Sequence, residues 1–189
     1  MIDVIGTDAG APASLPAAQQ ALIPAAEQIA APRRLQPPLE TWLEGPVPLI
    51  DSDDPRHLVE VLSALSAQTN AVVLASGDPL WFGIGRILAE RLGPERLRFH
   101  PAPTCLQLAF ARIGRPWQDA RWVSLHGRDP EPLARELQTR PRALAVLTDP
   151  GRGGADTVRR CLRSSGLEAS YQLWLGENLG RDDERMRLI

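Results

Sequence analysis

A glycine-containing turn with an acidic side chain directly follows an apolar segment in the middle of the chain. Residues 71–75 read Ala-Val-Val-Leu-Ala, and Ser76-Gly77-Asp78-Pro79 come next. In an open parallel sheet, ligands bind in the crevice beyond the carboxyl ends of the strands. Gly77 lets a ligand approach the backbone, and Asp78 offers a carboxylate to a hydroxyl or ammonium group. This turn therefore predicts a binding loop for a small polar ligand.

The alternative role for Asp78 is to cap a helix. An Asp at the N-cap accepts a free backbone amide, and a Pro at the first helical position has no amide to satisfy. The chain holds four such pairs: Asp54-Pro55, Asp78-Pro79, Asp129-Pro130 and Asp149-Pro150. Capping is the simplest interpretation of each, so Asp78 is set apart only by the strand and glycine before it.

Two further glycine turns lack complete nucleotide-binding signatures. The turn from Gly6 to Gly10 does not satisfy G-x-G-x-x-G, and Gly151-Arg152-Gly153-Gly154 lacks the G-K-[ST] ending of a phosphate loop. Lysine is absent from the chain, which excludes a Walker-type nucleotidase. No G-x-S-x-G or H-E-x-x-H motif is present, and no Cys has a His partner identifiable by spacing. A reaction driven by positioning, such as methyl transfer from a sulfonium, suits this pattern best.

The number and type of charged residues indicate which kinds of ligand the protein can bind. All 21 basic residues are arginine, and 23 acidic residues leave a net charge of −2, which excludes a globally basic protein that wraps nucleic acid. A high-GC genome produces such an arginine bias without any functional cause. The alternative is that guanidiniums bind an anionic ligand. Three of them, Arg159, Arg160 and Arg163, are predicted to lie on a solvated helix face.

The remaining composition predicts a cytoplasmic protein with neither a metal centre nor a membrane span. Cys105 and Cys161 form no C-x-x-C motif, and the three His are scattered, so no zinc cluster is indicated. No apolar run approaches the ~18 residues that a membrane span needs. The N-terminus reads as a strand, with none of the basic residues that open a signal peptide.

Short apolar segments alternate with helical patterns, which is typical of an α/β protein with parallel strands. The segment Arg115-Pro116-Trp117 interrupts the alternation and predicts two α/β lobes, residues 1–114 and 115–189. Irregular structure is expected over 32–48. The expected strands are 2–5, 71–75, 97–99, 122–125, 143–147 and 169–175, and the expected helices are 14–29, 58–65, 84–92, 106–113, 130–138 and 156–165.

Taken in order, these motifs resemble the tetrapyrrole (precorrin/uroporphyrinogen) methylase family over nearly the whole chain. The matching segments are Val4-Ile5-Gly6 with Gly10, Ser76-Gly77-Asp78-Pro79 with Gly83, 101–107, Leu147-Thr148-Asp149, and Glu177-Asn178-Leu179-Gly180 with Glu184-Arg185. Ser124-Leu125-His126-Gly127-Arg128 resembles the signature of the subgroup that methylates carbon 5 of a precorrin. Ala9 stands where the family usually has Pro, and Asp8 where many members have Gly.

The resemblance implies a two-lobed class III methyltransferase fold, with S-adenosylmethionine in a cleft between the lobes and a homodimer as the usual assembly. It also implies that the second lobe is short at its C-terminus. The chain is then either a naturally short form or part of a longer protein that is fused to, or works with, a second methyltransferase/decarboxylase domain. The implied cofactor-binding residues are Gly6, Ala9, Ser76, Gly77, Asp78, Trp81, Thr104, Cys105, Thr148 and Leu179.

The implied reaction is methylation of carbon 5 of a precorrin intermediate in cobalamin biosynthesis, with no protein nucleophile. The corrinoid substrate carries many carboxylates, for which His126, Arg128 and Arg112 are the candidate partners. Arg115 and Arg152 are weaker candidates. Two alternatives stay open: another acceptor (uroporphyrinogen, diphthine or a ribosomal RNA ribose), or a non-catalytic ligand-binding module. The charge balance and the few aromatic residues argue against RNA.

Overall fold

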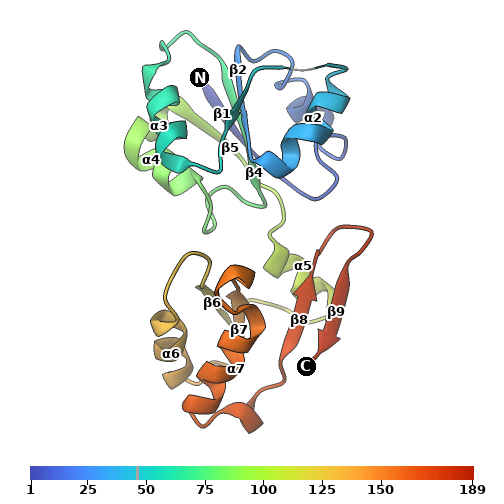
Figure 1. Ribbon diagram of the computed structural model, residues 1–189, viewed down its shortest axis with the longest axis vertical. Helices are drawn as coiled ribbons and strands as arrows, with labels where there is room; N and C mark the ends of the chain where they lie inside the picture. The colour runs from blue at the N-terminus through green and yellow to red at the C-terminus, as the bar shows by residue number, and fades with distance from the viewer. Residues whose placement is uncertain (46) are drawn as a thin grey trace. The chain divides into compact units, whose positions relative to one another are not determined.

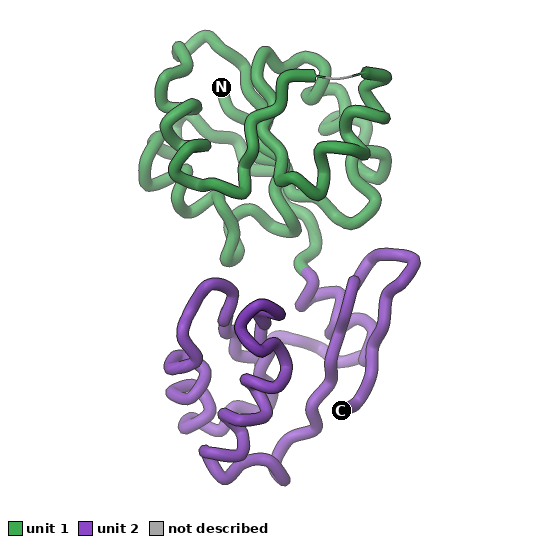
Figure 2. The backbone as a smooth tube through the Cα atoms, viewed as in Figure 1, with its two compact units in different colours: residues 1–104 green, residues 105–189 purple. Residues whose placement is uncertain are grey.

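The computed structural model describes residues 1–45 and 47–189, which divide into two units (Figure 2). Unit 1 is Met1–Thr104 and unit 2 is Cys105–Ile189. The interruption at Arg115-Pro116-Trp117 predicts a later boundary, at 114/115, after helix α5 (Cys105–Arg112). That helix packs within unit 2, where Phe110 contacts Trp122 with ring centroids 5.7 Å apart.

Unit 1 is an α/β unit built on a five-stranded parallel sheet in the order β3-β2-β4-β1-β5 (Figure 1). Its elements in chain order are β1 (Ile2–Thr7), α1 (Ala17–Gln20), β2 (Gln28–Ala31), η1 (Arg33–Leu35), α2 (Gln36–Trp42), β3 (Leu49–Asp51), α3 (Pro55–Ala64), β4 (Ala71–Ser76), α4 (Gly85–Leu92), η2 (Pro94–Arg96) and β5 (Leu97–His100). The predicted strands at 2–5, 71–75 and 97–99 are thereby confirmed.

Helices cover both faces of this sheet, α3 and α4 on one side and α2 on the other (Figure 1). Alternate residues of β4 explain the arrangement: Val73 packs with the α3–α4 layer, and Val72 with the α2 layer. Strands buried on both faces read as continuous apolar runs, which is why β4 is recognisable in the sequence, and β1 is recognisable by Ile2, Val4 and Ile5 although Asp3 interrupts it. All loops at the carboxyl edge of the sheet are consequently supported by two packed layers.

Two sequence predictions for unit 1 are wrong. The helix expected over 14–29 is limited to α1, because Pro24 interrupts it and Gln28–Ala31 pair with β3 and β4 instead. The segment 32–48, expected to be irregular, contains η1 and α2. Helix α2 forms because its prolines lie in the first turn, where a missing amide costs no hydrogen bond, and because Leu39 is fully buried.

Unit 2 contains a parallel pair of strands and a separate antiparallel hairpin. After α5 come β6 (Ala120–Ser124), α6 (Glu131–Gln138), β7 (Ala143–Leu147), η3 (Pro150–Arg152), α7 (Gly154–Ser164), η4 (Glu168–Ser170), β8 (Trp174–Glu177) and β9 (Arg185–Leu188). Helices α6 and α7 pack on the β6–β7 pair through a core that includes Val123, Leu133 and Leu162.

The predicted strand at 169–175 begins later than expected, as β8, and β9 is missing from the sequence prediction. The sequence Arg-Met-Arg-Leu of β9 carries charged residues on an exposed strand, so it lacks a clear apolar signal. No helix among the described residues is long and apolar enough to cross a membrane.

Candidate functional site

Two loops of unit 1 and the end of β5 meet β1 at Gly6, close to the carboxyl end of β1. A Cβ at this position would lie 2.3 Å from the Gly77 carbonyl oxygen, 2.7 Å from the Ala102 nitrogen and 3.0 Å from the His100 oxygen. These backbone atoms belong to β5 and to the segments that follow β4 and β5, so only glycine permits the approach. The Gly77 nitrogen also donates to the Thr7 oxygen at 2.8 Å.

The predicted binding loop lies at this carboxyl edge, as expected from the sequence. Ser76 is the exposed last residue of β4, and Gly77 adopts a φ of +63°, a left-handed conformation that favours glycine. The Leu80 nitrogen donates to Asp78 Oδ1 at 2.9 Å, so one oxygen of the carboxylate holds the turn. Asp78 is half-buried, and the exposed Ser76 hydroxyl lies two residues before it.

The residues after Asp78 form a turn, so Asp78 does not cap a helix, and the helix expected over 84–92 is confirmed as α4. Helix α4 begins only at Gly85, and the Gly85 nitrogen donates to the Pro79 oxygen at 2.8 Å. Phe82 has a φ of +53°, which no α-helix accommodates. The turn places the Trp81 and Phe82 rings edge to face, with centroids 4.7 Å apart.

Of the four Asp-Pro aspartates, Asp54 is confirmed as a helix N-cap and accepts amides from Arg56 and His57. Asp149 caps η3 through the Gly151 amide. Asp129 is not an N-cap: α6 has Pro130 at that position, and no side chain caps it. Asp78 therefore differs from Asp54 in holding a loop instead of a helix start.

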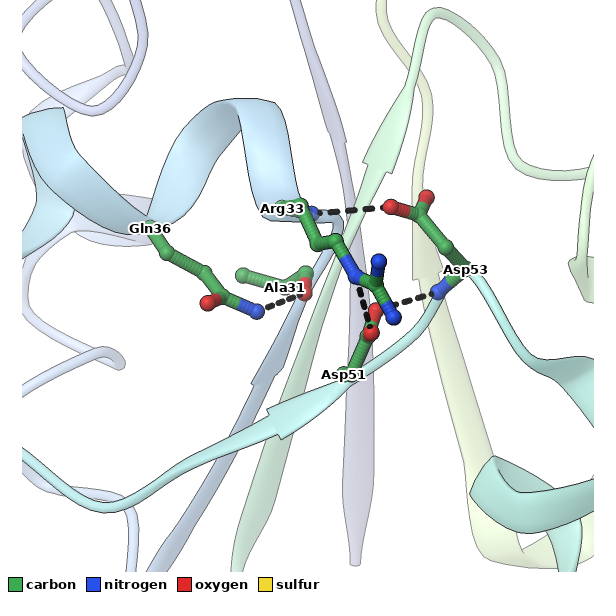
Figure 3. Close-up of polar contacts among 5 residues, drawn as sticks. All are labelled: Ala31, Arg33, Gln36, Asp51 and Asp53. Atoms are coloured by element: carbon green, nitrogen blue, oxygen red, sulfur yellow. Dashed lines mark hydrogen bonds and ion pairs between the residues drawn. The ribbon is translucent and has the colours of Figure 1, made fainter.

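A polar network joins the carboxyl ends of β2 and β3 (Figure 3). The Arg33 side chain donates to Asp51 Oδ2 at 2.6 Å, and the Arg33 amide donates to Asp53 Oδ2 at 3.0 Å. The Asp53 amide and the Arg33 guanidinium lower the pKa of Asp51 below its ordinary value, in that order of importance. The next residue, Arg34, reaches to β4 and donates to Ser76 Oγ at 2.6 Å.

The other predicted residues of unit 1 flank the same edge. Ala9 lies in an exposed turn that the Gly10 amide closes by donating to Asp8 Oδ1 at 2.9 Å. Thr104 is buried, and its Cα would lie 3.4 Å from a Cβ at Gly77. Unit 1 thus brings Gly6, Gly77 and Thr104 into one cluster of loops.

Unit 2 contains a pocket of about 710 Å³ lined mainly by apolar side chains of α5, β7, α7 and the β8–β9 hairpin. Cys105, Thr148 and Leu179, the three cofactor-binding candidates of this unit, all border it. Leu179 is held there by its packing on Gly176, where a Cβ would lie 2.9 Å from Leu179 Cδ1. An apolar wall with a few polar groups at its edge is typical of a small-molecule site.

Cys105 begins α5, and the partial desolvation of its thiol raises the pKa of Cys105 above its ordinary value. The thiol form is therefore favoured at neutral pH, and the thiolate is the nucleophilic form. The prediction that Cys105 is a buried small residue rather than a nucleophile is wrong as to burial, because Cys105 is exposed.

The substrate candidates separate into two locations within unit 2. Arg112 forms a bidentate ion pair with Glu184, which also accepts the Gly180 amide at 2.7 Å. The Arg112 side chain is thus engaged in bracing the β8–β9 turn. His126 and Arg128 instead lie in the exposed loop that follows β6.

Asp149 connects that loop to the loop after β7. Its Oδ2 accepts the Gly127 amide at 3.0 Å, and its Oδ1 accepts the Gly151 amide at 3.0 Å. The Gly127 amide is the main cause of the lowered pKa of Asp149, followed by the Gly151 amide and, more weakly, by His126 and Arg152. The ionised carboxylate therefore fixes both loops at the carboxyl edge of β6 and β7.

A smaller pocket of about 310 Å³ opens beside these loops; it contains Arg128 and Arg152, two candidates from the sequence, and Arg160, which sequence reasoning did not propose. Its basic residues are Arg128, Arg152 and Arg160, its acidic residues are Asp129 and Asp149, and Leu125, Pro130, Gly154 and Thr157 complete the lining. Arg160 was expected on a solvated helix face with Arg159 and Arg163. The sequence offers no signal that separates these three arginines.

Comparison with known proteins gives the family. The chain matches the model of the Tetrapyrrole (Corrin/Porphyrin) Methylases over residues 1–188. The chain belongs to this family. One relative of this tetrapyrrole methylase is the precorrin-6Y C(5,15)-methyltransferase [decarboxylating] of Sinorhizobium sp. The two sequences are 39% identical over 131 residues, and this alignment covers 69% of this chain and 30% of that protein.

A second relative is the cobalt-precorrin-7 C(5)-methyltransferase of Salmonella typhimurium, 36% identical over 118 residues, or 62% of this chain and 56% of that protein. The chain thus spans less than two thirds of the length of either curated relative. Among solved structures, the uroporphyrin-III C-methyltransferase of Thermus thermophilus in complex with S-adenosylhomocysteine has the same fold, with a TM-score of 0.68, 22% identity, and coverage of 100% of this chain and 87% of that one.

Proposed function

We propose that this tetrapyrrole methylase transfers a methyl group from S-adenosylmethionine to carbon 5 of a precorrin macrocycle in cobalamin biosynthesis. The observation that carries the proposal is the identity of 36% and 39% to two proteins named for methylation at this carbon. The solved relative in complex with S-adenosylhomocysteine supports the choice of cofactor.

The residues of each unit suit such a cofactor. Unit 1 offers an exposed Ser76 hydroxyl and the half-buried Asp78 carboxylate for the amino and hydroxyl groups of the ligand. Unit 2 offers the apolar pocket of about 710 Å³ bordered by Cys105, Thr148 and Leu179, whose walls suit an aromatic base. When bound, the cofactor supplies a methyl group already activated by the positive sulfur.

The protein's task is then to hold and orient its ligands. The backbone crossing at Gly6 gives the binding loop a rigid base, and the Leu80 amide holds the Asp78 carboxylate in place. Alignment of this kind supplies a large part of the rate enhancement of a bimolecular transfer. No side chain needs to form a covalent bond, which agrees with a Cys105 thiol kept protonated by its raised pKa.

Calorimetric titration with S-adenosylhomocysteine tests the cofactor assignment. We expect saturable binding of one molecule per chain, with a dissociation constant in the micromolar range. Absence of binding at high micromolar ligand would contradict the proposal and favour a non-catalytic module. The homodimer and a partner methyltransferase/decarboxylase domain stay predictions from the family resemblance, and the cytoplasmic location stays a prediction from composition.

A further inference from the structure

The smaller pocket of unit 2 has the charge and position of an anion site. It lies where the loops after β6 and β7 meet the start of α7, at the carboxyl edge of a parallel strand pair. Ligands of α/β proteins bind at this edge. Three guanidiniums and two carboxylates line the pocket, which leaves an excess of positive charge.

The two carboxylates of the pocket, Asp149 and Asp129, differ in their surroundings. Both oxygens of Asp149 accept backbone amides, from Gly127 and Gly151, so this group is engaged by the loops that carry the arginines. Asp129 is exposed at the pocket edge. Among the described residues, no ion pair involves Arg152 or Arg160. By contrast, Arg159 pairs with Asp156 on the outer face of the same helix, and Arg163 pairs with Glu168.

A chain of hydrogen bonds holds Arg160 toward the loop. Arg160 Nη2 donates to Thr157 Oγ1 at 2.8 Å, and Thr157 Oγ1 donates to the Arg152 carbonyl oxygen at 3.0 Å. Gly153, with a φ of +92°, makes room for both side chains: a Cβ there would lie 2.7 Å from Thr157 Oγ1 and 3.2 Å from Arg160 Nη2. The Thr157 hydroxyl and the absence of a side chain at Gly153 thus fix the orientation of the Arg160 guanidinium.

We propose that Arg152 and Arg160, together with Arg128, form a pocket that binds one carboxylate side chain of the macrocyclic substrate. This inference rests on the proposed function, because it deepens the assignment of the substrate. A guanidinium matches a planar carboxylate through two parallel hydrogen bonds. A volume of about 310 Å³ admits a short acidic side chain and excludes the macrocycle itself. The pocket thus combines Arg128 and Arg152, both candidates from the sequence, with Arg160.

Binding of uroporphyrin III, a stable coloured tetrapyrrole polycarboxylate, tests this pocket through its change in absorbance. The double variant Arg152→Ala/Arg160→Ala is expected to bind the porphyrin at least about tenfold more weakly, because it loses charge-assisted hydrogen bonds. Arg159→Ala/Arg163→Ala is the matched control, since it also removes two positive charges from unit 2, and it is expected to bind as the wild type does. Arg152→Lys/Arg160→Lys keeps the charge without the planar fork and is expected to fall between the two.

If the two alanine double variants bind the porphyrin equally weakly, the proposal is overturned, because the loss of affinity would then follow from the net charge of the protein and not from the pocket. Unchanged binding in Arg152→Ala/Arg160→Ala, or no binding of porphyrin by the wild type, would overturn it as well. S-adenosylhomocysteine binding, measured on every variant, is expected to stay within about twofold of wild type and reports an intact fold. If the cofactor analogue binds and only the porphyrin result fails, this inference fails while the cofactor assignment stands.

Discussion

Replacing Gly6 with alanine is expected to destabilise unit 1 by about 3 kcal/mol or more, among the larger effects of a single methyl group. The added Cβ would lie 2.3 Å from the Gly77 oxygen and 2.7 Å from the Ala102 nitrogen. Both are backbone atoms, so no side-chain rotation relieves the contact. Strand β1 would have to shift relative to β4 and β5, and the binding loop that begins at Gly77 would move with it.

Urea denaturation followed by circular dichroism measures this loss. Gly45→Ala is the matched control, because a Cβ at Gly45 meets no atom within 4 Å. We expect the control to unfold at nearly the wild-type urea concentration. Equal midpoints for the two variants would show that the loops do not pack at Gly6 as described.

Replacing Asp78 with alanine is expected to weaken S-adenosylhomocysteine binding by about 10- to 100-fold, the usual range for a charge-assisted hydrogen bond. The carboxylate is half-buried at the carboxyl edge of β4, and the Leu80 amide holds one of its oxygens. The other oxygen is available to an amino or hydroxyl group. Calorimetric titration of the variant gives the change in affinity directly.

Asp54→Ala provides the control for this variant. Asp54 also precedes a proline and accepts backbone amides, but it caps α3 and takes no part in the loop after β4. Its removal is expected to cost about 1 kcal/mol of stability and to leave the affinity for the cofactor analogue unchanged. Similar affinities for the two variants would mean that Asp78 acts only as a turn residue. Asp78→Asn, which keeps an acceptor for Leu80, separates the carboxylate charge from the turn.

The parts of the fold that could be predicted are those governed by local pattern or by burial on both faces. Strand β4 is a nearly continuous apolar run because helices cover both sides of the sheet, and β1 has the same apolar character apart from Asp3 and Thr7. The Asp54 cap and the end of α5 near Gly114, whose φ is +64°, follow from local chemistry. Strand β2 was missed because three of its four residues are glutamine or alanine, good helix formers, while its pairing with β4 is long-range.

The candidate site shows the same division. Ser76, Gly77 and Asp78 were identifiable because a glycine and an acid directly follow a buried strand. The pocket around Arg160 was not identifiable, because the direction in which each arginine of α7 points depends on how the helix starts. That start is set by Gly153 in the left-handed conformation, with no side chain capping the helix. This backbone conformation cannot be recognised from composition or periodicity.

The most direct test of the account is methyl transfer itself. The purified chain is incubated with precorrin-7 and methyl-labelled S-adenosylmethionine, and the product is analysed for label and for its position on the macrocycle. We predict incorporation at carbon 5 that depends on enzyme concentration and is strongly reduced in Asp78→Ala. Label at a different position of the macrocycle, or no transfer by a chain that binds S-adenosylhomocysteine, would contradict the proposed function.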